Sequence, residues 1–142
     1  MTSTTTLSDT TPFTRIGGAE TVDRLVDAFY DNMETLPEAQ HIRAMHDKDL
    51  GPTRAILKLY LAEWLGGPST YSAQKGHPRL RMRHMHLSIG PKERDAWLLC
   101  MSKALAATIE DRAMREGIYQ NLVKLADWMR NDPDNAHDKG HR

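Results

Sequence analysis

Apolar residues recur at intervals of three and four along most of the chain, which is the period of an amphipathic helix. The first long stretch of this kind ends before Pro37 and carries Val22, Leu25, Val26, Phe29, Tyr30 and Met33. The second covers residues 50–65 and carries Ile56, Leu57, Tyr60, Leu61, Trp64 and Leu65. Each stretch predicts a helix with one wide buried face.

Two more helices are predicted in the second half of the chain. One begins at Gly90-Pro91, because proline is tolerated at the first helical position, and should bury Trp97, Cys100, Met101, Ala104, Leu105, Thr108 and Ile109. The other covers residues 112–130 and should bury Ile118, Leu122, Leu125 and either Trp128 or Met129. No strand-like alternation is visible, so the sequence predicts an all-α fold.

Shorter segments connect these helices. Residues 13–16 predict one helical turn, and residues 37–45 predict a short helix. After Gly66-Gly67-Pro68 we expect an irregular loop up to Lys75. Residues 1–12 are expected to be a disordered lead-in and residues 131–142 a flexible tail, which leaves residues 13–130 as one domain.

Composition narrows the cellular context and the partners. Lys+Arg and Asp+Glu both number 19, which gives no support to a nucleic-acid or membrane-surface partner. The single cysteine excludes an internal disulfide framework and fits a reducing cytoplasm. No stretch approaches a membrane span, and the N-terminus lacks a signal-peptide pattern, so we expect a cytoplasmic protein.

The candidate chemistry lies in the run Gly76-His77-Pro78-Arg79-Leu80-Arg81-Met82-Arg83-His84. Its proline predicts a short helix, on which Leu80 and His84 share one face and Arg79 and Arg83 share a neighbouring face. Haem needs an imidazole for its iron, apolar walls for its ring and cations for its propionates. A histidine on an apolar helix face is also common in protein cores, so the run alone leaves both interpretations open.

His86 suggests a second metal hypothesis. Residues two apart on a helix point in different directions, so His84 and His86 cannot both face one iron. Together with His77 they could indicate zinc, but no Cys, Asp or Glu ligand sits close in sequence. Zinc is therefore the weaker alternative.

Across residues 13–130 the sequence resembles a group II truncated haemoglobin. The residues that carry the resemblance are Phe29-Tyr30, Gly66-Gly67-Pro68, Tyr71, the run ending at His84, and Arg94-Asp95-Ala96-Trp97. The resemblance implies a truncated globin, a two-over-two helical sandwich around haem b (iron protoporphyrin IX). No Cys-x-x-Cys-His motif is present, so the haem would be held without thioether links.

The resemblance also implies roles for single residues. His84 matches the proximal ligand of the iron, and further cofactor contacts fall on Arg83, Tyr71, His77, Arg79, Leu57, Thr53 and Phe29. Thr53 stands where ordinary globins have a histidine. Ile56 stands where many relatives carry a Lys or Arg that faces a propionate, so Arg79, Arg83 or Lys75 would have to compensate.

On the distal side the resemblance places Tyr30, Trp97 and, as a polar residue, His46. Dioxygen on ferrous haem takes up partial negative charge, which hydrogen-bond donors stabilise. Tyr30 offers an O–H, Trp97 an N–H and His46 a third donor. Two or three donors predict slow oxygen release, which makes a poor carrier.

Three functions remain open. The first is reversible binding of dioxygen and other diatomic ligands for redox chemistry, with nitric oxide dioxygenase or peroxidase-like activity. Because the chain carries no flavin or nicotinamide domain, an external reductase would supply electrons. The second is oxygen storage, transport, delivery or sensing without turnover, and the third is a helical module without a cofactor. A monomer and a homodimer are both compatible with the sequence.

Overall fold

The computed structural model describes residues 11–76, 84, 87 and 89–130, and within these ranges every regular element is a helix. The elements are α1 (Pro12–Arg15), α2 (Ala19–Thr35), the 3-10 helix η2 (Pro37–Ala39), α3 (Gln40–Arg43), α4 (Gly51–Trp64), α5 (Thr70–Lys75), α7 (Pro91–Thr108) and α8 (Arg112–Met129). The all-α class is confirmed, and the four long predicted helices are present with closely matching ends.

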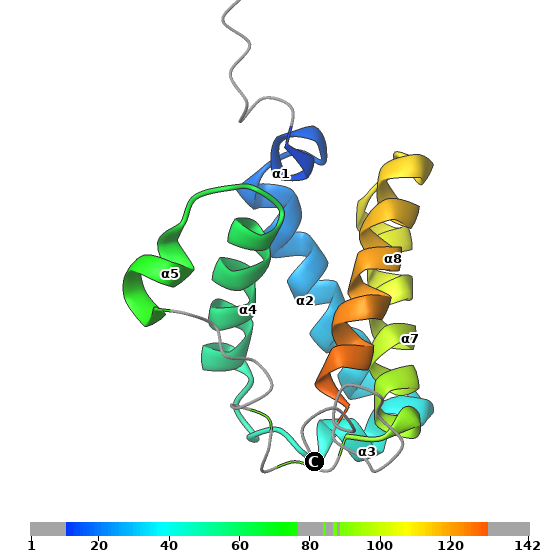
Figure 1. The fold of residues 1–142 in the computed structure, drawn as a ribbon. Helices are drawn as coiled ribbons and strands as arrows, with labels where there is room; N and C mark the ends of the chain where they lie inside the picture. Colours follow the sequence, from blue (N-terminus) through cyan, green and yellow to red (C-terminus); the bar gives the residue numbers. More distant parts are fainter. Residues whose placement is uncertain (1–10, 77–83, 85–86, 88, 131–142) are drawn as a thin grey trace, which may run out of the picture.

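Two pairs of helices form the layers of the molecule. α2 packs against α4, and α7 packs against α8. The most extensive contact joins α2 to α7 and so connects the two pairs. In Figure 1, α4 and α5 lie on one side, α7 and α8 on the other, and α2 runs between them. This is the two-over-two sandwich that the resemblance implies.

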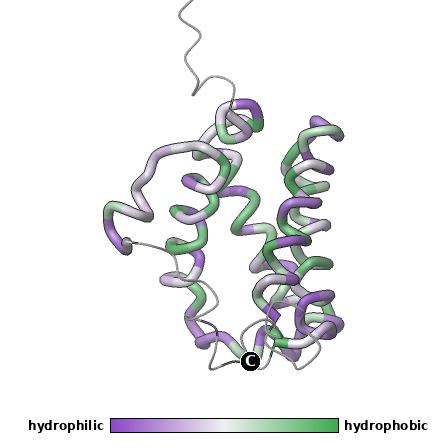
Figure 2. Tube along the Cα trace, in the orientation of Figure 1, coloured by the Kyte–Doolittle hydropathy of each residue, from purple (hydrophilic) through white to green (hydrophobic). Residues whose placement is uncertain are grey.

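The core follows the predicted periodicity most closely on α2. Its buried residues are Thr21, Val22, Leu25, Val26, Phe29, Tyr30 and Met33. Figure 2 shows apolar and polar segments alternating along the helices, as expected when each helix has one buried face. None of the described helices combines the length and apolar composition that a membrane crossing requires.

The predicted apolar stripe of α4 divides into two parts. Leu61 and Leu65 are buried in the core, while Leu57 and Tyr60 are half-buried and Ile56 is 41% exposed. The more exposed group faces a cavity, described below, instead of a neighbouring helix.

Residues 70–75 form the helix α5, so the prediction of an irregular loop was wrong there. Glu63 on α4 accepts hydrogen bonds from the Ser72 backbone N–H, at 2.9 Å, and from the Ser72 hydroxyl. Tyr71 packs edge-on against Tyr60, with ring centroids 5.5 Å apart. These contacts with α4 stabilise a helix that six residues would not form alone.

The glycines that end α4 allow α1 to dock against it. Gly66 has a φ of +98°, a conformation that other residues rarely adopt. A Cβ on Gly67 would lie 2.7 Å from the Phe13 ring. The Phe13 N–H donates to the Leu65 carbonyl at 2.9 Å, so the chain before α2 is fixed to the end of α4.

The buried face of α8 differs in part from the prediction. Ile118 and Leu122 are buried as expected, and Ala126 joins them. Of the two alternatives left open, Trp128 is 40% exposed whereas Met129 is half-buried and lines the cavity.

Cys100 is buried on α7, and its backbone contacts α2. Its side chain is 0% exposed, and burial raises the pKa of its thiol to about 11. Asn32 of α2 donates from its side-chain amide to the Cys100 carbonyl at 3.0 Å, which adds a polar contact between the two helices.

Candidate functional site

A cavity of about 360 Å³ is lined by residues from both layers. Of the residues predicted for the site, it is lined by Tyr30, His46, Thr53, Leu57, Tyr71, His84 and Trp97. Phe29 does not line it, and Arg79, Arg83 and His77 lie outside the described residues. The fold therefore brings seven of the predicted residues to one cavity, from positions up to 67 residues apart.

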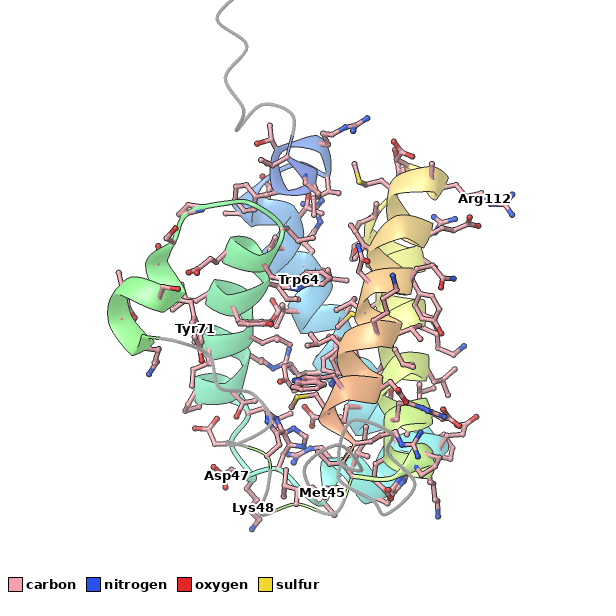
Figure 3. All side chains as sticks on the ribbon, in the orientation of Figure 1. Met45, Asp47, Lys48, Trp64, Tyr71 and Arg112 are labelled. Atoms are coloured by element: carbon pink, nitrogen blue, oxygen red, sulfur yellow. The ribbon has the colours of Figure 1, made fainter. Side chains whose placement is uncertain are left out.

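The cavity wall is completed by residues that the sequence did not single out for a site. They are Ile42, Met45, Tyr60, Leu87, Ile89, Glu93, Leu125, Ala126 and Met129. Ile56 and Arg94, which were named above with the family resemblance, also line the cavity. Figure 3 shows two places on this wall, Met45 next to α3 and Tyr71 on the side of α5 that faces α4. Most of these residues are apolar, so the wall suits a largely hydrophobic ligand.

Three aromatic rings form a cluster on α2 and α7. The Phe29 ring lies edge-on to Tyr30, with centroids 4.8 Å apart, and edge-on to Trp97, at 5.2 Å. Phe29 is 0% exposed, so it supports both neighbours from the core while they line the cavity. Edge-on packing of this kind fixes ring orientation as well as position.

The Tyr30 hydroxyl group is kept in its protonated form. The side chain is 5% exposed, and burial raises its pKa well above the ordinary value, although the charge of Arg54 acts in the opposite direction. A protonated phenol is a hydrogen-bond donor. Tyr30 thus presents an O–H, and not a phenolate, near neutral pH.

His46 is oriented by a backbone contact. Its Nδ1 lies 2.8 Å from the Ile42 carbonyl, and because a carbonyl can only accept, Nδ1 must carry the proton. Neutral His46 then has an unprotonated Nε2, which accepts hydrogen bonds. Its ring lies 6.1 Å from that of Tyr30, so it neighbours the phenol, but it can act as a donor from Nε2 only when doubly protonated.

Arg94 places a cation in the cavity wall near the start of α7. It is fixed by the carboxylates of Asp127, at 2.9 Å, and Asp95, at 3.1 Å. Glu93 also lines the cavity and accepts from the Gly90 N–H at 2.9 Å, which caps the helix. The sequence contained both residues, but spacing alone did not show that they face the cavity.

The donor set fits haem. The described wall offers an imidazole (His84) and extensive apolar and aromatic surface, which are the groups that iron and porphyrin ring require. The guanidinium of Arg94 adds a cation to the wall, paired with Asp127 and Asp95. No cluster of three or more His, Cys, Asp or Glu suited to a bare metal ion occurs among the described residues, and His77 and His86 of the zinc hypothesis lie outside them.

Comparison with known proteins gives consistent results. A family model described as bacterial-like globin matches residues 11–131. The chain is 34% identical over 114 residues to the group 2 truncated haemoglobin YjbI of Bacillus subtilis (strain 168), which covers 80% of this chain and 84% of that protein.

Two solved structures extend the similarity to three dimensions. One is a group II 2-on-2 haemoglobin from Agrobacterium tumefaciens, with 45% identity, a TM-score of 0.84 and coverage of 92% of this chain and 98% of that one. The other is a cold-adapted truncated haemoglobin from Pseudoalteromonas haloplanktis TAC125, with 37% identity, a TM-score of 0.84 and coverage of 86% and 98%. The globin match supports haem-based binding of diatomic ligands. The chain belongs to the group II truncated haemoglobins, within the bacterial-like globin family.

Proposed function

We propose that this chain binds haem b for redox chemistry. It holds dioxygen tightly enough to oxidise nitric oxide, and in a separate, peroxidase-like reaction the haem without dioxygen reduces peroxide with electrons from an external reductant. When bound, haem would supply a ferrous iron that binds dioxygen reversibly and gives up one electron when that dioxygen combines with nitric oxide to form nitrate, so that an external reductant has to restore it. The remaining features of the site are supplied by the chain itself.

His84 is the proposed iron ligand, because its imidazole lines the cavity and matches the proximal position of the family motif. We expect the cofactor to contact Tyr71 and two residues one turn apart on α4, Thr53 and Leu57. Arg79, Arg83 and His77 remain proposed partners of the propionates, outside the described residues.

The position of Tyr30, buried and in the cavity wall, is the observation that carries the proposal. The Tyr30 phenol and Trp97 both line the cavity, and the Phe29 ring packs edge-on against both of their rings. A hydrogen bond to a charged acceptor is worth about 1.5–3 kcal/mol, and a buried site strengthens it. Two donors aimed at a partly charged ligand retain that ligand, which favours chemistry over rapid delivery.

The test is the rate of oxygen release from the ferrous protein in stopped-flow experiments. Tyr30→Phe removes only the hydroxyl and should release oxygen roughly ten- to a hundredfold faster. Trp97→Phe should act in the same direction. Tyr60→Phe is the matched control, because it removes a phenolic hydroxyl that lines the same cavity outside the proposed donor pair.

Turnover with nitric oxide separates chemistry from storage. The wild type should consume nitric oxide repeatedly with a reductant present, and Tyr30→Phe should do so more slowly. Slow oxygen release without any turnover would favour storage instead. Wild-type release in both Tyr30→Phe and Trp97→Phe would contradict the proposed donors, and a missing Soret band after haem addition would contradict haem binding altogether.

A further inference from the structure

Arg54 of α4 lies next to Tyr30, which lines the cavity. It is not part of the cavity wall, yet its guanidinium carbon lies 5.7 Å from the centroid of the Tyr30 ring. The side chain is only 21% exposed, which is unusual for an arginine. A guanidinium at this distance over an aromatic face is attracted by the ring, and more strongly where water is excluded.

Three carboxylates of α2 hold this guanidinium in place. Nη1 donates to Asp27 at 3.1 Å, and Nη2 donates to Asp31 at 2.9 Å and to Glu34 at 3.4 Å. The three acidic residues follow one another at offsets of four and three, so they form a ridge along one face of α2. Nη1 also donates to the Asp27 backbone carbonyl at 3.2 Å.

Tyr30 lies between Asp27 and Asp31 in the sequence of the same helix, so two carboxylates of the ridge flank it along the chain. Arg54 cannot leave the Tyr30 ring without giving up hydrogen bonds to these acceptors. Its planar fork, with donors in fixed directions, suits several acceptors at once in a way that a lysine ammonium does not.

We propose that Arg54 is the positioning residue of Tyr30, fixing the phenol ring against Phe29 and strengthening its hydroxyl as a donor to the diatomic ligand. The proposal rests on the proposed function, because it assumes that Tyr30 contacts the ligand. A cation over the ring draws electron density from the phenol and polarises its O–H bond. In keeping with this, Arg54 acts to lower the pKa of Tyr30 against the larger, opposite effect of burial.

Lys58 provides a matched control. It lies one turn after Arg54 on α4, and its ammonium nitrogen is 3.2 Å from Asp27. It therefore forms an ion pair between the same two helices, and its side chain is 29% exposed. The cation over the Tyr30 ring is that of Arg54. Lys58→Met removes an α2–α4 ion pair without removing that cation.

The experiment measures oxygen release and the C–O stretching frequency of the carbon monoxide complex in Arg54→Leu, Arg54→Lys and Lys58→Met. Arg54→Leu should release oxygen about two- to tenfold faster and shift the stretch to higher frequency, because the field on the ligand becomes less positive. Arg54→Lys keeps the charge but not the fork, and should restore part of both effects. Lys58→Met should match the wild type in both.

The same substitutions in a Tyr30→Phe background show whether Arg54 acts through the phenol. In that background Arg54→Leu should have no further effect on release or on the stretch. An equal effect in both backgrounds would overturn the inference, since it would assign Arg54 a general structural role. If Arg54→Leu fails to retain haem, Arg54→Lys in the two backgrounds provides the same comparison.

The outcome also separates this inference from the proposed function. Faster release in Tyr30→Phe together with wild-type release and frequency in both Arg54 variants would overturn the inference alone. Unchanged release in Tyr30→Phe would overturn the role of Tyr30 as a donor, and the inference with it.

Discussion

Replacing Phe29 by leucine is expected to loosen Tyr30 and Trp97 together. Phe29 is 0% exposed and presents ring contacts at 4.8 Å and 5.2 Å to its two neighbours. Leucine keeps an apolar side chain there but has no ring edge. Each aromatic contact is worth about 0.5–1.5 kcal/mol beyond its buried area, so the loss of both should lower the free energy of unfolding by about 1–3 kcal/mol.

This loss should be visible in stability and in ligand release. For a chain of this size each kcal/mol lowers the melting temperature by about 2–4 °C, so Phe29→Leu should melt roughly 2–12 °C below the wild type. Oxygen release from the ferrous protein should become about two- to tenfold faster, because both proposed donors lose the wall that orients them.

Leu122→Val is the control for a general loss of stability. Leu122 is equally buried, on α8, and does not line the cavity. Removing one buried methylene costs about 1 kcal/mol, so this variant should melt earlier while releasing oxygen at the wild-type rate. A Phe29→Leu protein that melts earlier but releases oxygen normally would refute the reasoning, because helix backbone alone would then orient the two donors.

Three further results are expected. His84→Ala should lose the Soret band and most of its haem, whereas His86→Ala should keep both; the opposite pattern would move the iron ligand. Ile56→Lys should slow haem transfer to an acceptor protein about 1.5- to fivefold at low salt and little at high salt, because a solvent-exposed ion pair with a propionate contributes about 0.2–1 kcal/mol. The neutral control Ile56→Met should have no effect. Asp127→Asn should destabilise the protein at neutral pH, and the difference from wild type should shrink as the pH falls below the ordinary carboxyl value of 3.8. Burial raises the pKa of Asp127, but the hydrogen bonds and charges of Arg94 and Arg130 outweigh burial and leave the pKa lowered. The stabilisation by Asp127 is therefore present above the unfolded-state pKa and disappears on acidification. A constant difference between variant and wild type across this pH range would contradict that sign.

The long helices could be predicted from the sequence because each has a continuous apolar stripe. α2 is the clearest case, since its whole predicted stripe is buried. α5 could not be predicted in this way, because its six residues carry one large apolar side chain and depend on Glu63, nine residues before Ser72. On α8, Met129 continues the spacing of Leu122 and Leu125 and is half-buried, whereas Trp128 lies toward the edge of that face and is 40% exposed.

The site required more than periodicity. Tyr30 and Trp97 are 67 residues apart, so only the resemblance to a family suggested that both line one site. Arg54 was missed, although the acidic ridge at Asp27, Asp31 and Glu34 is visible in the sequence and a buried cation facing it is a reasonable expectation. Arg54, the cation that pairs with these carboxylates, lies on α4, so spacing within α2 cannot identify it.

The burial of Cys100 has a consequence for the reactivity of its thiol. Its thiol is 0% exposed and its pKa is raised to about 11, so in the folded protein it is neither accessible nor ionised near neutral pH. Thiolates react with oxidants and alkylating agents, while buried thiols do not. Since this is the only cysteine of the chain, its labelling by a thiol reagent reports the separation of α2 from α7. The labelling rate therefore measures how often this part of the core opens.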